Sequence, residues 1–164
     1  MAHPLYDASV PTFLHFLQAL SKLIDKAAAS GLPEAQILEA RLAPDMFPFP
    51  RQVQIATDLA KGAVARLTGE PGPSWPDDEA TLAELKGRLA KAMDHLGAVS
   101  PEAFEGSESR QIEITASGRE LRYTGQTYLH GFAIPNFFFH VTTAYALLRK
   151  EGVKLGKPDF FGAD

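Results

Sequence analysis

Residues 136–148 read NFFFHVTTAYALL and decide the fold more than any other stretch of the chain. Aromatic and aliphatic side chains occupy most directions around a helical wheel, which is typical of a helix buried at the centre of a bundle. Pro135 stands just before this stretch, so a helix over about residues 125–150 must either kink or restart there. We therefore expect a buried last helix against which the rest of the chain packs.

Three earlier segments carry apolar residues at spacings of three and four, the pattern of amphipathic α-helices. They cover about residues 6–29, 51–68 and 77–96, and a short helix is expected over 33–38. The acidic run Asp77-Asp78-Glu79 would start the third of these helices, where it suits the helix dipole. Proline-rich stretches, in the loop 42–50 and the linker 71–76, separate the helices.

Residues 111–115 and 120–123 alternate polar and apolar side chains on either side of a turn at 116–119, which predicts a β-hairpin. Two strands alone are not stable, so the hairpin must lean on the helices. The sequence therefore predicts a single domain over residues 1–164. Its fold class is all-α, a four-helix bundle with a small hairpin inserted before the last helix.

Composition restricts the function classes. The 164 residues carry a net charge of −4 and show no basic patch, so neither nucleic acid nor an anionic membrane surface is expected as a partner. No apolar run reaches the length of about 20 residues that a membrane span needs. The absence of cysteine excludes disulfides, thiolate metal sites and a cysteine nucleophile. Residues 1–7 do not resemble a signal peptide, and we expect a cytoplasmic protein.

The polar residues of the last helix are the best candidates for chemistry. Asn136 and His140 are four residues apart and share one face, with Thr143 beside them. A buried polar group without a partner costs about 1–3 kcal/mol, so this stripe needs partners. Two interpretations stay open: half of a metal or ligand site, or a hydrogen-bonded core cluster, which is the commoner case. On the second long helix Gln52 falls near the inner arc of the wheel, and Gln54 falls further round.

Three blocks of sequence, 42–48 (LAPDMFP), 51–56 (RQVQIA) and 135–145 (PNFFFHVTTAY), resemble a bacterial family named only as a domain of unknown function, number 1993. The resemblance extends from Tyr6 to Phe161. That family is similar to the wider DinB-like group of helical bundles, which implies an up-down-down-up four-helix bundle and a homodimer. Many members of the wider group bind a divalent metal through three histidines, one on the second helix and a His-x-x-x-His pair on the last.

Carried onto this chain, the resemblance places His140 at the second histidine of that pair. Asn136 stands where the first would be, and Gln54 (or Gln52) stands near the histidine of the second helix. The implied metal site for zinc or nickel is thus His140, Asn136 and Gln54, with amides in place of two ligands. Amide oxygens are weaker ligands for these ions than imidazole.

Two functional hypotheses follow. The preferred one is a small-ligand-binding or structural protein with a degenerate metal site, in which His140 belongs to a closed hydrogen-bonded cluster without a pocket. The alternative is a divalent-metal-dependent enzyme of the thiol transferase or hydrolase type, acting on a small molecule at His140. It predicts an open pocket and a perturbed pKa at that residue. The sequence assigns no catalytic residue, and the loop 46–49 is expected to pack against the bundle rather than to form a lid over a ligand or part of a dimer face.

Overall fold

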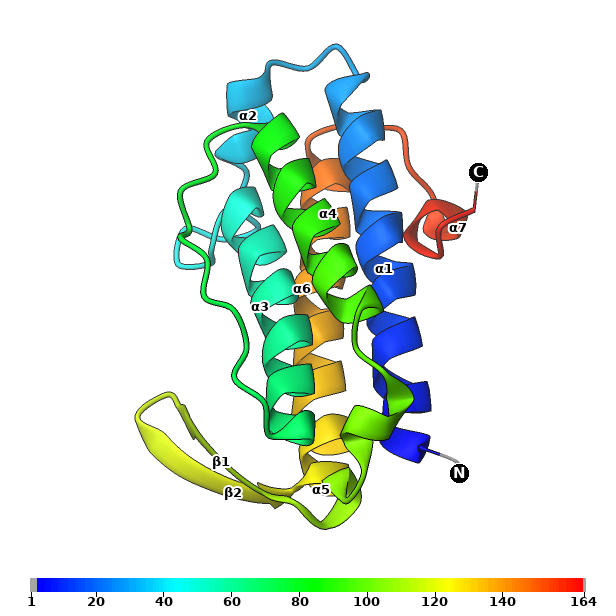
Figure 1. Cartoon of the computed structure of the whole chain (residues 1–164). Coiled ribbons are helices and arrows are strands. Elements are labelled where there is room, and N and C mark those ends of the chain that lie inside the picture. Colours follow the sequence, from blue (N-terminus) through cyan, green and yellow to red (C-terminus); the bar gives the residue numbers. More distant parts are fainter. Residues whose placement is uncertain (1–2, 164) are drawn as a thin grey trace.

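Four long helices run side by side: α1 (Pro4–Ala28), α3 (Phe49–Thr68), α4 (Leu82–Gly97) and α6 (Ile134–Lys150). The computed structural model describes residues 3–163. In it, α1 and α6 point one way and α3 and α4 point the other, so the topology is up-down-down-up, as predicted (Figure 1). Helix α3 packs against α4 and α6, and α1 packs against the same two helices. The core lies between them, where the rings of Phe13 and Phe137 meet edge to face at 4.8 Å.

The linker between α3 and α4 runs the length of the bundle, because two consecutive parallel helices can be joined only by a long return (Figure 1). Helix α3 ends at Gly69, whose φ of 78° gives a left-handed cap. Helix α4 begins at Leu82, later than predicted, because Thr81 and Glu84 form a capping box there. Residues 77–79 therefore do not start a helix. They remain in the linker, and their carboxylates are free for other contacts.

The predicted hairpin is present at one end of the bundle (Figure 1). Strands β1 (Gln111–Ala116) and β2 (Arg119–Thr124) pair antiparallel, and Ile112 and Ile114 of β1 are buried. Two short 3-10 turns, Pro101–Phe104 and Ser107–Ser109, lead into it. Gly125 follows β2 and opens the short helix α5 (Gly125–Tyr128). A Cβ at this position would lie 1.9 Å from the Ser107 carbonyl oxygen, so only glycine fits where the hairpin meets the bundle.

A π-helical turn, Leu129–Ala133, joins α5 to α6. Pro135 has no N–H, and its ring would crowd the carbonyl four residues earlier in a regular helix, so the wider turn relieves that contact. The chain thus restarts as α6 at Ile134. The expectation of a buried last helix holds for most of its residues, but not for all: Phe139 is 54% exposed, and Thr142 also faces solvent. Helix α6 has one face in the core and one on the surface.

Two short helices complete the fold. Helix α2 (Glu34–Leu38) lies where predicted, and the Glu34 carboxylate accepts a hydrogen bond of 2.8 Å from the Leu82 N–H at the start of α4. Helix α7 (Lys157–Phe160) forms in a tail that shows no periodic pattern, and Asp159 of α7 pairs with Lys26 of α1. Within residues 3–163, no helix is both long and apolar enough to cross a membrane.

Candidate functional site

His140 sits where α6 meets the first turns of α3. Its Nδ1 lies 2.7 Å from the Oε1 atom of Gln52, and both side chains are buried, His140 being 9% exposed. The amide nitrogen of Gln52 donates in turn to the Phe47 carbonyl oxygen at 3.0 Å. A chain of two hydrogen bonds therefore connects the loop before α3, through Gln52, to the imidazole on α6.

Gln54 does not lie in this chain. Residues two apart on an α-helix point about 200° away from each other, so Gln52 and Gln54 cannot face the same neighbour. The Gln54 amide nitrogen donates to the Glu79 carboxylate of the linker at 2.9 Å. Gln52, and not Gln54, is thus the partner of His140, in contrast to the ligand set that the resemblance implies.

The other two members of the predicted stripe on α6 also have separate surroundings. Asn136 is half-buried, and its side chain makes no hydrogen bond within residues 3–163. The Thr143 hydroxyl donates to the Phe139 carbonyl of its own helix at 2.6 Å. The stripe is therefore not one network, and only His140 reaches across to a second helix.

The electrostatics of the site favour an uncharged imidazole. Burial, together with a smaller effect of the positive charge of Arg51 on α3, lowers the pKa of His140 to about 4. Arg51 lies over the Phe47 ring at 5.7 Å and pairs with Asp77 at 2.6 Å. At neutral pH His140 is therefore a neutral group, and the nearby cation already has a carboxylate partner.

The residues present do not fit a divalent metal centre. Zinc sites use at least three protein ligands, commonly imidazole, thiolate or carboxylate. In the described part of the chain no three His, Asp or Glu side chains gather in a way that would hold an ion. The Gln52 amide is engaged at both ends and Gln54 is turned toward Glu79. A single imidazole nitrogen remains, with Asn136 one turn away.

An open groove lies on the surface of α6 beside His140. It has a volume of about 440 Å³ and is lined by Leu42, Phe138, Phe139, Thr142, Thr143 and Ala146. The Phe139 ring stands perpendicular to the imidazole at 5.1 Å. Small-molecule pockets span roughly 300–1,000 Å³, so this volume suits a small ligand. His140 itself does not line the groove, but Phe139, whose ring packs against the imidazole, does. The surface thus has a hollow next to the hydrogen-bonded cluster, and not a pocket that opens at His140.

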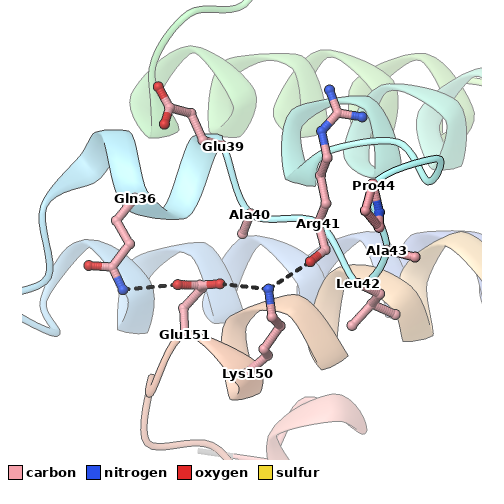
Figure 2. A pocket seen from close by; sticks show the side chains of 9 residues that line it. All are labelled: Gln36, Glu39, Ala40, Arg41, Leu42, Ala43, Pro44, Lys150 and Glu151. Atoms are coloured by element: carbon pink, nitrogen blue, oxygen red, sulfur yellow. Dashed lines mark hydrogen bonds and ion pairs between the residues drawn. The ribbon is translucent and has the colours of Figure 1, made fainter.

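A second hollow of about 460 Å³ adjoins the groove, and Leu42 lines both. Figure 2 shows the chain of contacts along it, from Gln36 to Glu151 at 2.9 Å, from Glu151 to Lys150, and from Lys150 to the Arg41 carbonyl at 2.7 Å. Because Lys150 and Glu151 satisfy each other and their neighbours, this hollow is a weaker candidate than the groove beside His140.

Arg88 on α4 forms a buried polar cluster on the other side of α3, and its side chain is 1% exposed. Burial opposes its charge, but the hydrogen bond to Glu79 and the nearby carboxylates outweigh burial and raise the pKa of Arg88. Its partners lie at 2.7–3.1 Å and are Thr57, Asp58, Pro76, Asp77 and Glu79. The guanidinium therefore ties the linker to α3 and α4.

The sequence analysis identified neither Arg88 nor the Phe47 carbonyl, the two groups that hold these polar clusters in place. Arg88 stands among the inward-facing residues of α4, between Leu85 and Leu89, and an arginine at such a position signals buried carboxylate partners. The Phe47 carbonyl, which holds Gln52, leaves no signal in the sequence because any residue supplies a carbonyl. The loop does pack at Phe49, which is fully buried, but the Phe47 ring is 53% exposed.

Comparison with known proteins agrees with the fold. The family described as a domain of unknown function (DUF1993) matches residues 5–161. A crystal structure of a DinB family member from Shewanella denitrificans is 41% identical, with a TM-score of 0.87 over 98% of this chain and 93% of that chain. No curated protein matches. The chain therefore belongs to the DUF1993 family and folds like a DinB family member.

Proposed function

We propose that this protein binds a small molecule in the groove beside His140, at a degenerate metal site. The observation that carries the proposal is the state of the second imidazole nitrogen. Among residues 3–163 every fully buried side-chain nitrogen or oxygen has a hydrogen-bond partner. The Nε2 atom of His140 has none there, so it must be reached by solvent. In the proposal a ligand in the groove extends past Phe139, whose ring packs against the imidazole, and reaches this open nitrogen.

The resemblance to the DinB-like group supports this reading of the site. Of the three positions where that group carries histidines, this chain keeps one, His140. The Gln52 amide occupies the space between α3 and α6 and bonds to His140 directly, as a metal ion otherwise would. In the proposal His140 and Asn136 contact the ligand, Gln52 holds the imidazole, and Gln54 belongs to the Arg88 cluster.

The alternative is a divalent-metal-dependent enzyme of the thiol transferase or hydrolase type. One observation favours it: imidazoles that bind metals usually donate their other N–H to an oxygen, as Nδ1 of His140 does to Gln52. The number of donors argues against it, since one imidazole and one half-buried amide are too few for zinc or nickel. No catalytic residue is assigned under either hypothesis.

Binding can be tested by NMR of ¹⁵N-labelled protein titrated with a library of small neutral fragments. We expect fragments to shift the amide signals of Phe139, His140 and Thr143 while leaving that of Arg88 in place. Ala146→Trp should abolish these shifts because the indole fills the groove. Ala90→Trp, at an exposed position on α4, is the matched control and should leave them intact. Fragments that shift no groove residue, or that bind equally to Ala146→Trp, would contradict the proposal.

We also propose that the protein is a cytoplasmic homodimer, in line with the resemblance and with a chain free of cysteine. Two large apolar side chains outside the groove, Phe47 and Phe161, are about half exposed and give a second copy apolar surface to cover. Light scattering after size-exclusion chromatography should give twice the chain mass of 17.8 kDa. A mass of one chain at every concentration tested would rule the dimer out.

A further inference from the structure

The hydrogen bonds from Phe47 through Gln52 to His140 have a fixed direction. A backbone carbonyl oxygen can only accept, so the group of Gln52 that lies 3.0 Å from it is the amide nitrogen. The amide oxygen of Gln52 then faces His140 at 2.7 Å. This oxygen can also only accept, so Nδ1 of His140 must carry a hydrogen.

The second ring nitrogen is consequently a bare acceptor. A neutral imidazole carries one ring hydrogen, and the contact with the Gln52 oxygen places that hydrogen on Nδ1. With that hydrogen on Nδ1, Nε2 presents a lone pair. Nε2 is also open to solvent, since it has no partner in the described part of the chain and is not enclosed.

The adjoining groove offers a second acceptor. The Thr143 hydroxyl donates its hydrogen to the Phe139 carbonyl, so toward a ligand its oxygen can only accept. None of the six residues that line the groove is charged, and four of them are apolar. The cation that acts on His140, Arg51, is paired with Asp77. The Thr142 hydroxyl, exposed in the groove, can donate or accept, so Nε2 of His140 and the Thr143 oxygen set the preference. They suit a ligand that donates hydrogen bonds and carries no negative charge.

We infer that Gln52, anchored on the Phe47 carbonyl, locks His140 as a permanent hydrogen-bond acceptor, and that the groove takes neutral, largely apolar molecules with an O–H or N–H donor. The inference rests on the proposed function, because it names the chemical class of that ligand. Gln52 is a positioning residue and acts through His140. Carboxylates and phosphates are disfavoured at Nε2 because they would place an acceptor against an acceptor there.

The lock is tested first, without any ligand, by long-range ¹H–¹⁵N NMR of the His140 ring at pH 7. We expect a hydrogen-bearing Nδ1 and a hydrogen-free Nε2. Gln52→Leu should release the ring into a mixture of both tautomers. Gln52→Glu should keep the Nδ1–H form, since a carboxylate also accepts from Nδ1, and should raise the pKa of His140. A wild-type ring with its hydrogen on Nε2 would overturn the inference, as would a Gln52→Leu ring that keeps one tautomer.

The ligand class is tested with phenol, anisole and benzoate, which share a ring and differ in the donor. Phenol should move the Nε2 signal of His140, and anisole, which lacks the O–H, should bind about tenfold more weakly, as should phenol to Gln52→Leu. Gln54→Leu is the matched control and should bind phenol like the wild type. Equal binding of phenol and anisole, or tighter binding of benzoate, would overturn the ligand class alone. If no probe shifts the NMR signals of the groove residues, both the ligand class and the proposed function fail. The tautomer experiment is independent of that outcome.

Discussion

Helix α3 carries a buried polar cluster on each of two sides, and the two clusters differ in what they leave open. On one side Arg88 meets side-chain or backbone oxygens from five residues of α3 and the linker. On the other side His140 contacts a single oxygen, that of the Gln52 amide. Gln52 and Gln54, two residues apart, belong one to each cluster.

The difference separates a structural cluster from a binding site. The donors of Arg88 point at several oxygens, and Asp58, Asp77 and Glu79 offset its charge, so nothing is left for a ligand to satisfy. The linker it holds crosses the whole bundle without secondary structure of its own. His140 instead has one nitrogen fixed and one open, beside a groove. A buried polar group that can still form a hydrogen bond, as His140 can, is the one that indicates a binding site.

Removing the arginine should have the largest effect on stability. Arg88→Met leaves the mostly buried carboxylate of Glu79 without a cation, whereas Asp58 keeps Lys61 and Asp77 keeps Arg51. We expect a loss of about 3 kcal/mol in the free energy of unfolding. Urea denaturation measures it. Arg88→Lys is the matched control: it keeps the charge but not the branched donor group, so it should lose less. A loss below about 1 kcal/mol in Arg88→Met would mean that the linker is held by other contacts.

Acid should weaken the protein through the other cluster. The unfolded chain binds a proton at His140 below its ordinary pKa of 6.5, whereas the folded protein resists until about pH 4. Stability is therefore complete above pH 6.5 and falls as the pH drops from 6.5 to 4, by up to about 3 kcal/mol. Arg88 stays charged throughout and takes no part.

The measurement is the free energy of unfolding at pH 7 and pH 5 in the wild type and in His140→Gln. The variant removes the titrating group, while the remaining histidines and carboxylates contribute equally to both proteins. The pH-dependent loss should be smaller in the variant. Equal losses in the two proteins would show that His140 titrates normally in the folded state.

Substitution of the two glutamines should have the smallest effects on stability, and it compares the two clusters directly. Gln52→Leu leaves the Nδ1–H of His140 and the Phe47 carbonyl without partners, and we expect a loss of about 1–3 kcal/mol. Gln54→Leu removes one donor from Glu79, which keeps Arg88, so a loss of about 0.5–1.5 kcal/mol is expected. Thermal or urea unfolding ranks the pair. The reverse order would assign the larger role to the linker side of α3.

The fold was predictable because its signals are local and repeated. Apolar spacings gave the four long helices, Gly69 gave the end of α3, and alternation gave the hairpin. The start of α4 was misplaced because acidic residues are common both at helix starts and around a buried arginine. Here Thr81 and Glu84 cap the helix, and Arg88 takes up the acidic run.

The site was predictable only in part. The position of His140 followed from its spacing, and the helical wheel made Gln52 a candidate partner, as the structure confirms. The resemblance favoured Gln54 instead, because a phase error of a residue or two decides which of the two faces inward. The exposure of Phe139 was missed since an aromatic run predicts burial without saying which side of the helix lacks a neighbour. The Phe47 carbonyl, being backbone, could be located only by the fold.

The central claim is that His140 serves as an open hydrogen-bond acceptor and not as one ligand of a metal centre. Elemental analysis tests it most directly, on protein purified without chelator or histidine tag, for the wild type and for His140→Ala. The account predicts zinc and nickel far below one ion per chain in both proteins. Near-stoichiometric metal in the wild type that disappears in His140→Ala would contradict it and establish the metalloenzyme alternative as the hypothesis to pursue.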